Sequence, residues 1–350
     1  MFRRSGKGNY AYVVTKVRAK KTTLLQEDSY AKLLMMSVPE ISRFISESGY
    51  QQEMSELAGR IEGIDLVEHA TYSNMAKVFR SILQASTGDL RDMLSAYLEK
   101  WDIWNLKVIL RGKLYGMDAD SIREDLVIAG ELSAADLEKL LSAGTEEEIL
   151  ASFGKMAKVA VPQDIMNAYK SSGNLTQVED YLDMLHYSRL IDRIDPFSAP
   201  ARLFQDFIRA EIDTVNLGTI LKLKAEGVYG PDVMKYVIPG GKQIDKQLAT
   251  QLANAETVAA TSADLAQLDF YDEIKGALES GSGSLRDIVS GMKRYQIQQA
   301  KRFSHLYPLS IVPILDFMIH KEIEVSNIRI IARGLSSGID RETIKGLLVM

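Results

Sequence analysis

Apolar residues recur at helical spacing along most of this chain, with polar residues between them. Residues 90–101 are apolar at positions 90, 93, 94, 97 and 101, which is the stripe of an amphipathic helix. A second helix is predicted from about Asp102 to Gly116, where glycine suits a left-handed helix end. The short β-branched runs fall inside the same helical period. The sequence therefore predicts an all-α fold.

One block of this pattern occurs three times without a gap inside it. The asparagines Asn105, Asn216 and Asn327 are separated by 111 residues (216 − 105 and 327 − 216). Apolar residues recur in the same register while the polar positions between them vary, as expected when only a buried helix face is constrained. An acid precedes each asparagine by three residues and a base follows it by six: Asp102 and Arg111, Asp213 and Lys222, and Glu324 and Arg333.

The period also predicts how the chain is divided. Steps of 111 residues counted back from Met350 give a basic N-terminal arm with a first helical repeat (1–128), a second repeat (129–239) and a third (240–350). Each is about the size of a small domain. Three pseudo-symmetric repeats of about 111 residues indicate a funnel-like body. The basic residues of 1–23 suit either an arm near anionic lipid or an acidic partner, or a solvated helix start.

Three stretches of the chain carry a resemblance to a known family. They are Asp102-x-x-Asn105-Leu106-Lys107-x-Ile109-x-Arg111-Gly112-Lys113 with its two copies, the opening helix Tyr10–Leu25, and Asn327–Gly334. They resemble the C subunit of the archaeal and bacterial A/V-type rotary ATP synthases, whose eukaryotic relative is the d subunit of the V-type ATPase. The resemblance extends over essentially the whole chain. The middle copy departs from the pattern, with Gly218 in place of Lys107 and Leu223 in place of Gly112.

The resemblance implies a non-catalytic subunit of the central stalk. Such a subunit is a socket between the rotor shaft and the membrane rotor ring, and it couples ATP synthesis or hydrolysis to H⁺ or Na⁺ transport. The implied partners are the other central-stalk subunits and the ring. The implied location is peripheral, at the cytoplasmic face of the cell membrane, with membrane contact made through the complex.

Composition and motifs argue against several other functions. A net charge of −5 does not suit a dedicated nucleic-acid binder. No phosphate loop or zinc motif is present, and no cofactor, metal or catalytic residue is expected. The nucleophile-elbow pattern at Gly334-Leu-Ser336-Ser-Gly338 is interpreted as a helix end, because a true elbow joins a strand to a helix. The remaining rivals are a general α-helical scaffold or adaptor without a rotary role and an enzyme with a dispersed site.

The repeated residues have more than one interpretation. The pair Asp102 and Asn105 suits a cap at the start of the second helix, with the acid near its positive end. The asparagine amide equally suits a bridge between backbone groups where two helices turn, or a partner contact. Arg111, Lys222 and Arg333 fall late in a helix and suit either its negative end or a neighbouring subunit.

Overall fold

The computed structural model describes residues 6–157, 161–192, 198–257, 259–279 and 285–349, and every regular element within them is a helix. The predicted all-α class is therefore confirmed. The first eleven helices are α1 (Tyr10–Lys21), α2 (Glu27–Leu33), α3 (Val38–Glu47), α4 (Gln51–Leu57), α5 (Gly63–Ala85), α6 (Gly88–Leu114), α7 (Ala119–Glu124), α8 (Ala134–Leu141), α9 (Glu146–Ala157), α10 (Gln163–Ser172) and α11 (Thr176–Asp192).

The later part of the chain continues in the same way. Its elements are α12 (Ala199–Ala225), α13 (Pro231–Met234), α14 (Lys246–Asn254), the 3₁₀ turn η1 (Ala259–Thr261), α15 (Ser262–Leu265), α16 (Tyr271–Glu279), α17 (Leu285–Leu306), α18 (Val312–Ser336) and α19 (Arg341–Leu347). None of the helices in the described ranges has the length and apolar composition needed to cross a bilayer.

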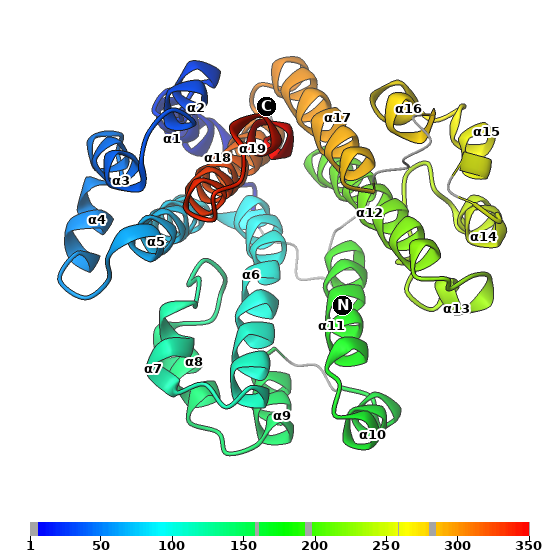
Figure 1. The fold of residues 1–350 in the computed structure, drawn as a ribbon. Helices are drawn as coiled ribbons and strands as arrows, with labels where there is room; N and C mark the ends of the chain where they lie inside the picture. The colour runs from blue at the N-terminus through cyan, green and yellow to red at the C-terminus, as the bar shows by residue number, and fades with distance from the viewer. Residues whose placement is uncertain (1–5, 158–160, 193–197, 258, 280–284, 350) are drawn as a thin grey trace. The chain divides into compact units, whose positions relative to one another are not determined.

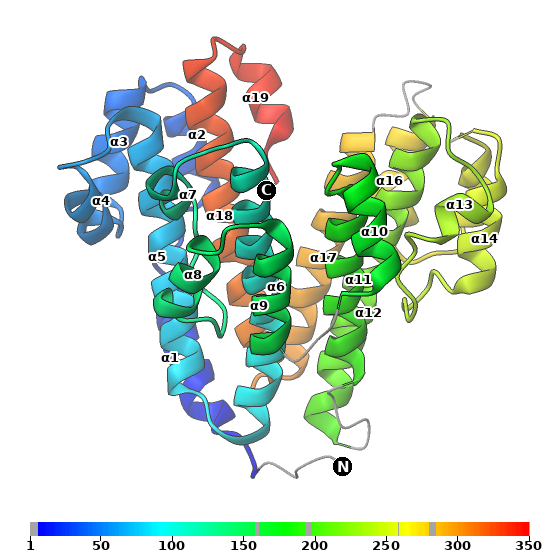
Figure 2. The ribbon, with the colours of Figure 1, turned by 90° about the horizontal axis from the view of Figure 1, so that it is seen from below.

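The chain divides into two compact units. The α12 unit comprises Tyr187–Ile319. The α6 unit is built from two segments, one that extends up to His186 and one from His320 to Leu348. In the α12 unit, α12 packs along α17, and α14 contacts both α12 and α13 (Figure 2). These boundaries do not follow the 111-residue period, so the division at 128 and 239 and the funnel-like body stay predictions.

Three apolar cores are each built on one long helix that carries the repeated block: core 1 on α6, core 2 on α12 and core 3 on α18. The same four repeat positions enter each core, because the period turns the same helix face inward. These residues are Leu106, Ile109, Leu110 and Ile122 in core 1; Leu217, Ile220, Leu221 and Val233 in core 2; and Ile328, Ile331, Ala332 and Ile344 in core 3.

The segments that complete the cores come from different parts of the chain. Core 1 adds residues of α8, α9 and α11, which follow α6, and core 2 adds residues of α14 to α17, which follow α12. Core 3 instead takes residues of α2 to α5 (Figure 1). Ile41 and Val67 therefore share a cluster with Ile328 and Ile331. The two ends of the chain therefore belong to one core.

A left-handed glycine ends each of the three long helices. Gly116, Gly227 and Gly338 have φ of 68°, 81° and 70°, which glycine adopts without strain. In each copy the N–H of the next residue bonds back to the carbonyl five residues earlier, at 2.8 to 2.9 Å, which is the Schellman closure. Ser336 thus lies on the last turn of α18, and the nucleophile-elbow pattern is explained by a helix end.

Close contact between each long helix and the short helix after it depends on residue size. A Cβ on Gly112 would lie 2.5 Å from Ile122, and a Cβ on Gly334 would lie 2.7 Å from Ile344. In the second copy Leu223 takes the glycine position and the smaller Val233 takes the isoleucine position, and both belong to core 2. The departure from the family pattern at Leu223 is thus accompanied by a smaller neighbour.

Candidate functional site

The acid and the asparagine of each copy lie inside one continuous helix. Helix α6 runs without a break from Gly88 to Leu114, past Asp102 and Asn105. The predicted junction of two helices at Asp102 is therefore wrong, and so is its interpretation as a cap. A cap serves the free N–H groups of the first helical turn, and Asp102 lies far beyond that turn. The apolar stripe continues through this region at one period because the helix does.

The asparagine amides bind backbone groups far along the chain. Asn105 donates from Nδ2 to the carbonyl of Val127 and accepts the N–H of Val127 at Oδ1, both at 2.8 Å. Asn216 makes the same two bonds to Ile238, also at 2.8 Å. Both amides are fully buried. The bridging interpretation fits these bonds, but the bridge joins a helix interior to a later segment without regular structure rather than two helices at a turn.

Asp102 is a buried carboxylate that holds the segment leading into α8. It accepts the N–H of Glu131 at 2.9 Å and that of Leu132 at 3.1 Å. A Cβ on Gly130 would lie 2.1 Å from the carboxylate, so only glycine lets the backbone come this close. Burial raises the pKa of Asp102 to about 7, and the two N–H donors oppose that rise.

Asp213 repeats this arrangement ahead of α14. Its carboxylate accepts the N–H of Gln243 at 2.8 Å and that of Ile244 at 3.0 Å. Gly241 stands where Gly130 stands in the first copy, and its Cβ would lie 2.3 Å from Asp213. Burial also raises the pKa of Asp213 above its ordinary value.

Glu324, the acid of the third copy, binds the N-terminal part of the chain. It accepts the N–H of Leu25 and the hydroxyl of Tyr50, and Lys321 Nζ lies 2.8 Å from the same carboxylate. Burial lowers the pKa of Lys321, whose ammonium also bonds the Tyr50 oxygen at 2.8 Å. Leu25 lies two residues before α2, as Leu132 lies two residues before α8. The repeated acid therefore anchors the segment that completes each core.

Two of the three repeated bases form ion pairs inside the α6 unit. Arg111 on α6 binds Glu179 on α11 through Nε at 2.6 Å and Nη2 at 2.5 Å. Arg333 on α18 binds Glu68 on α5 through the same two nitrogens. Lys222 in the second copy is exposed. The first and third bases thus tie their long helix to a helix that completes the core, and the predicted partner contact of all three stays a prediction.

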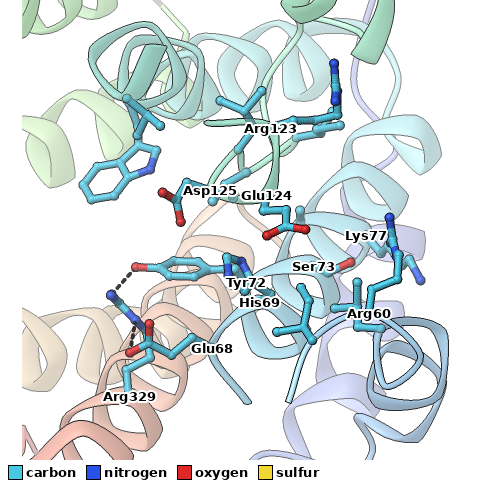
Figure 3. Close-up of a pocket in the computed structure, with 18 of the residues that line it drawn as sticks. Arg60, Glu68, His69, Tyr72, Ser73, Lys77, Arg123, Glu124, Asp125 and Arg329 are labelled. Carbon is cyan, nitrogen blue, oxygen red and sulfur yellow. Dashed lines mark hydrogen bonds and ion pairs between the residues drawn. The ribbon is translucent and has the colours of Figure 1, made fainter. Parts of the chain in front are cut away.

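A pocket of about 680 Å³ opens in the α6 unit beside the ion pair of Arg333 with Glu68 (Figure 3). Glu68 lies at its base with only 7% of its side chain exposed, and Arg329 Nε is 3.5 Å from it. The Arg329 guanidinium donates to the Tyr72 hydroxyl and lies 4.7 Å from the centre of the Tyr72 ring. Trp104, which is 43% exposed, forms another part of the wall. The buried part of the pocket is an ion-pair network that joins α5 to α18.

Sequence reasoning missed Glu68 and Tyr72 because their partners are remote. The Glu68–Arg333 pair spans 265 residues and the Tyr72–Arg329 pair spans 257. Neither residue belongs to the repeated block. The base at Arg333 was visible as a repeat position, but nothing in the period identifies the acid that faces it.

Comparison with known proteins gives a match along nearly the whole chain. The family model described as ATP synthase (C/AC39) subunit matches residues 13–347. The A-type ATP synthase C subunit of Methanosarcina acetivorans is 37% identical over 350 residues, covering 99% of this chain and 95% of its own. The subunits of the same name from Halobacterium salinarum and Archaeoglobus fulgidus are 35% and 32% identical, and each alignment covers at least 98% of both chains.

Proposed function

Because this chain belongs to the family of ATP synthase (C/AC39) subunits, we propose that it is the non-catalytic central-stalk subunit of an A/V-type rotary ATP synthase. In this role it is a socket that links the rotor shaft to the membrane rotor ring. It carries torque between ATP synthesis or hydrolysis and the movement of H⁺ or Na⁺. The observation that carries the proposal is the full-length match to the family.

The chemistry of the sequence supports a mechanical role. No stretch fits the phosphate loop G-x-x-x-x-G-K-[ST], which cradles nucleotide phosphates. We assign nucleotide chemistry to partner subunits and torque transmission to this one. Its partners are then the other central-stalk subunits and the ring, and its location is the cytoplasmic face of the cell membrane, held there through the complex.

The ends of the long helices supply a surface for the shaft. Beyond the last turns of α6, Tyr115 is 78% exposed and Met117 is 44% exposed, and Ile339 after α18 is 40% exposed. Met117 and Ile339 occupy the same repeat position, directly after the left-handed glycine. Exposed apolar side chains at a conformationally fixed helix end are suited to docking against a partner. We assign these side chains to the shaft contact.

The repeated bases stand near the same helix ends. The Arg111 and Arg333 side chains are 57% and 61% exposed although each holds an acid, and Lys222 is exposed. Their remaining N–H groups are available to carboxylates of a partner. Because a rim charge contributes little by itself, Lys222→Ala alone should change assembly only slightly.

The test compares ATP hydrolysis with ion uptake in reconstituted vesicles. Omitting this chain should leave hydrolysis by the detached catalytic head intact and abolish ion uptake, because the head has its own phosphate loops and torque must pass through the socket. Tyr115→Ser with Met117→Ser should reduce uptake per ATP hydrolysed, and Met35→Ser, at a residue that is 66% exposed, is the matched control.

Two results would contradict the socket. Full ion uptake without this chain would remove it from the torque path, and loss of hydrolysis in the soluble head would give it a catalytic role. The scaffold rival makes a different prediction in native membranes. A scaffold would be recovered with unrelated partners, whereas a socket should bring down stalk and ring subunits together.

A further inference from the structure

The turn between α17 and α18 presents three large apolar side chains to solvent. Leu306 is 58% exposed, Tyr307 is 43% exposed and Leu309 is 65% exposed. With Pro308 between them, four successive residues at this tip are apolar or weakly polar. A cluster of exposed apolar side chains often marks an interaction surface, whereas single exposed apolar residues are common on any protein.

Hydrogen bonds inside the turn fix these side chains in outward positions. The N–H of Tyr307 continues the helix to the carbonyl of Phe303 at 2.8 Å. Ser310 donates its hydroxyl to the Tyr307 carbonyl at 2.8 Å and accepts the N–H of Val312 at 3.2 Å. The Tyr307 ring stacks on Phe303, with centroids 6.2 Å apart and an interplanar angle of 21°. The tip is therefore an ordered turn.

The corresponding turn of the first copy shows that the fold does not require exposed apolar residues here. Between α5 and α6 it reads Ser86-Thr87. This chain's own N-terminal segment covers that turn, because Asn9 donates to the carbonyl of Ala85 at 2.8 Å and accepts the N–H of Thr87 at 3.0 Å. The apolar tip of the third copy is thus an addition to the repeated plan.

Basic residues surround the tip. Lys301, Arg302 and His305 lie exposed on the last turns of α17. The sequence has no acid between Asp287 and Asp316, a stretch that also holds Lys293 and Arg294. From a neighbouring segment, Lys242 Nζ lies 5.9 Å from the centre of the Phe303 ring and adds another cation. Exposed apolar residues surrounded by basic side chains are typical of a surface that binds anionic lipid.

We propose that this tip is a lipid-contact element that inserts into the headgroup layer of an anionic bilayer. Leu306 and Leu309 enter the boundary between headgroups and acyl chains, and Tyr307 takes the interfacial depth where an aromatic ring with a hydroxyl is favoured. Lys301 and Arg302 bind lipid phosphates. A single tip of this size gives weak, reversible binding that depends on anionic lipid. The proposal concerns this chain alone and stands or falls independently of the torque role.

Sedimentation of the full chain with vesicles tests the proposal. Vesicles of equal parts phosphatidylcholine and phosphatidylglycerol should bind it, and pure phosphatidylcholine vesicles should bind it far less. Leu306→Ser with Leu309→Ser should weaken binding by at least about tenfold. The matched control is Tyr12→Ser with Met35→Ser, which removes side chains that are 63% and 66% exposed elsewhere, and it should bind like the wild type.

The cations should act only on the charged vesicles. Lys301→Gln with Arg302→Gln should weaken binding to phosphatidylglycerol vesicles by roughly twenty-five-fold, since each cation near an anionic surface contributes about fivefold. Added salt should weaken wild-type binding in the same direction. Binding that is unchanged by both tip and cation variants would overturn the proposal, as would no vesicle binding by the wild type.

A fluorophore distinguishes insertion from adsorption at the surface. The chain has no cysteine, so Leu309→Cys and Met35→Cys each accept one environment-sensitive label. On anionic vesicles the label at 309 should brighten and be quenched by lipids that carry a quencher in the acyl chain, while the label at 35 should not respond. An unresponsive label at 309 would overturn insertion. Binding that appears only when the vesicles carry rotor-ring protein would assign the tip to a protein partner and also overturn the proposal.

Discussion

The side chain of Asn105 pairs with both backbone groups of Val127, donating to the carbonyl and accepting the N–H at 2.8 Å each. Asn216 and Ile238 repeat this pair at the same separation of 22 residues. An amide offers one donor and one acceptor side by side, as a strand neighbour would. The asparagine therefore gives hydrogen bonds to a buried backbone segment that belongs to no helix or sheet.

Removing this amide should destabilise core 1. Asn105→Ala leaves the N–H of Val127 buried without a partner, while the carbonyl of Val127 keeps the N–H of Ala129 at 2.8 Å. We expect the free energy of unfolding to fall by about 1–3 kcal/mol. Urea unfolding measures the loss, and hydrogen exchange at the Val127 N–H should accelerate. Asn167→Ala, at an exposed position, is the control and should change stability by no more than about 0.5 kcal/mol. Equal effects of the two substitutions would contradict the structural role of Asn105.

Asp102 should make the chain less stable as the pH rises from about 4 to about 7. Its pKa is about 7 in the folded chain and near 3.8 without the fold, so folding takes up a proton in this window. The stability that depends on neutral Asp102 is fully present below pH 3.8, the pKa without the fold. It is lost as the pH rises through about 7, the pKa in the folded chain.

Comparison with Asp102→Asn isolates this effect from other titrating groups. The thermal midpoint of the wild type should fall relative to that of the variant between pH about 4 and about 7, and the difference should level off above that. A difference that stays constant over the whole window would mean that Asp102 is ionised throughout.

The ion-pair network of the pocket should stabilise core 3. Glu68→Gln removes the buried carboxylate between Arg333 and Arg329 and should lower the free energy of unfolding by about 1–3 kcal/mol. This is less than for a fully buried pair, because the Arg333 side chain is 61% exposed and its charge is screened. The fluorescence of Trp104, which lines the pocket, should also change. Glu47→Gln, in an exposed pair with Arg43, should leave both unchanged.

Two glycines inside long helices should respond to alanine in opposite directions. Gly112→Ala places a Cβ 2.5 Å from Ile122 and should destabilise by about 1–3 kcal/mol. At Gly218 the nearest atom is 3.5 Å away on Val289, so alanine fits and should stabilise by up to about 1 kcal/mol through helix propensity. Thermal unfolding measures whether each substitution raises or lowers stability. Equal destabilisation by both would refute the packing argument at Gly112.

The parts of this fold that the sequence predicts are those that depend on local spacing. Leu106 and its equivalents are buried where the 111-residue period indicates, and Gly116 ends its helix in the left-handed conformation. These features follow from side chains a few residues apart. The junction predicted at Asp102 failed because a polar pair inside an apolar stripe was interpreted as a helix boundary, whereas its partners are backbone groups in a later segment.

The parts that escaped prediction depend on which segments meet in space. No period identifies Glu68 as the partner of Arg333, because the acid lies outside the repeated block. The same holds for Tyr50 and Glu324, 274 residues apart. The exposure of Leu306 and Leu309 was equally invisible, since an apolar residue at a helix end predicts burial as readily as contact with a partner.

Because core 3 joins α2 to α5 with α18, its folding must wait until α18 has been synthesised. The N–H of Leu25 and the carboxylate of Glu324 are 299 residues apart, so α2 to α5 leave the ribosome long before α18 can cover them. We expect a nascent chain arrested before α18 to be cleaved readily by protease around Ile41 and Val67 and to resist cleavage in core 1. A product that lacks α18 would then be recognised by its uncovered helices α2 to α5, which lie far along the chain from the missing segment.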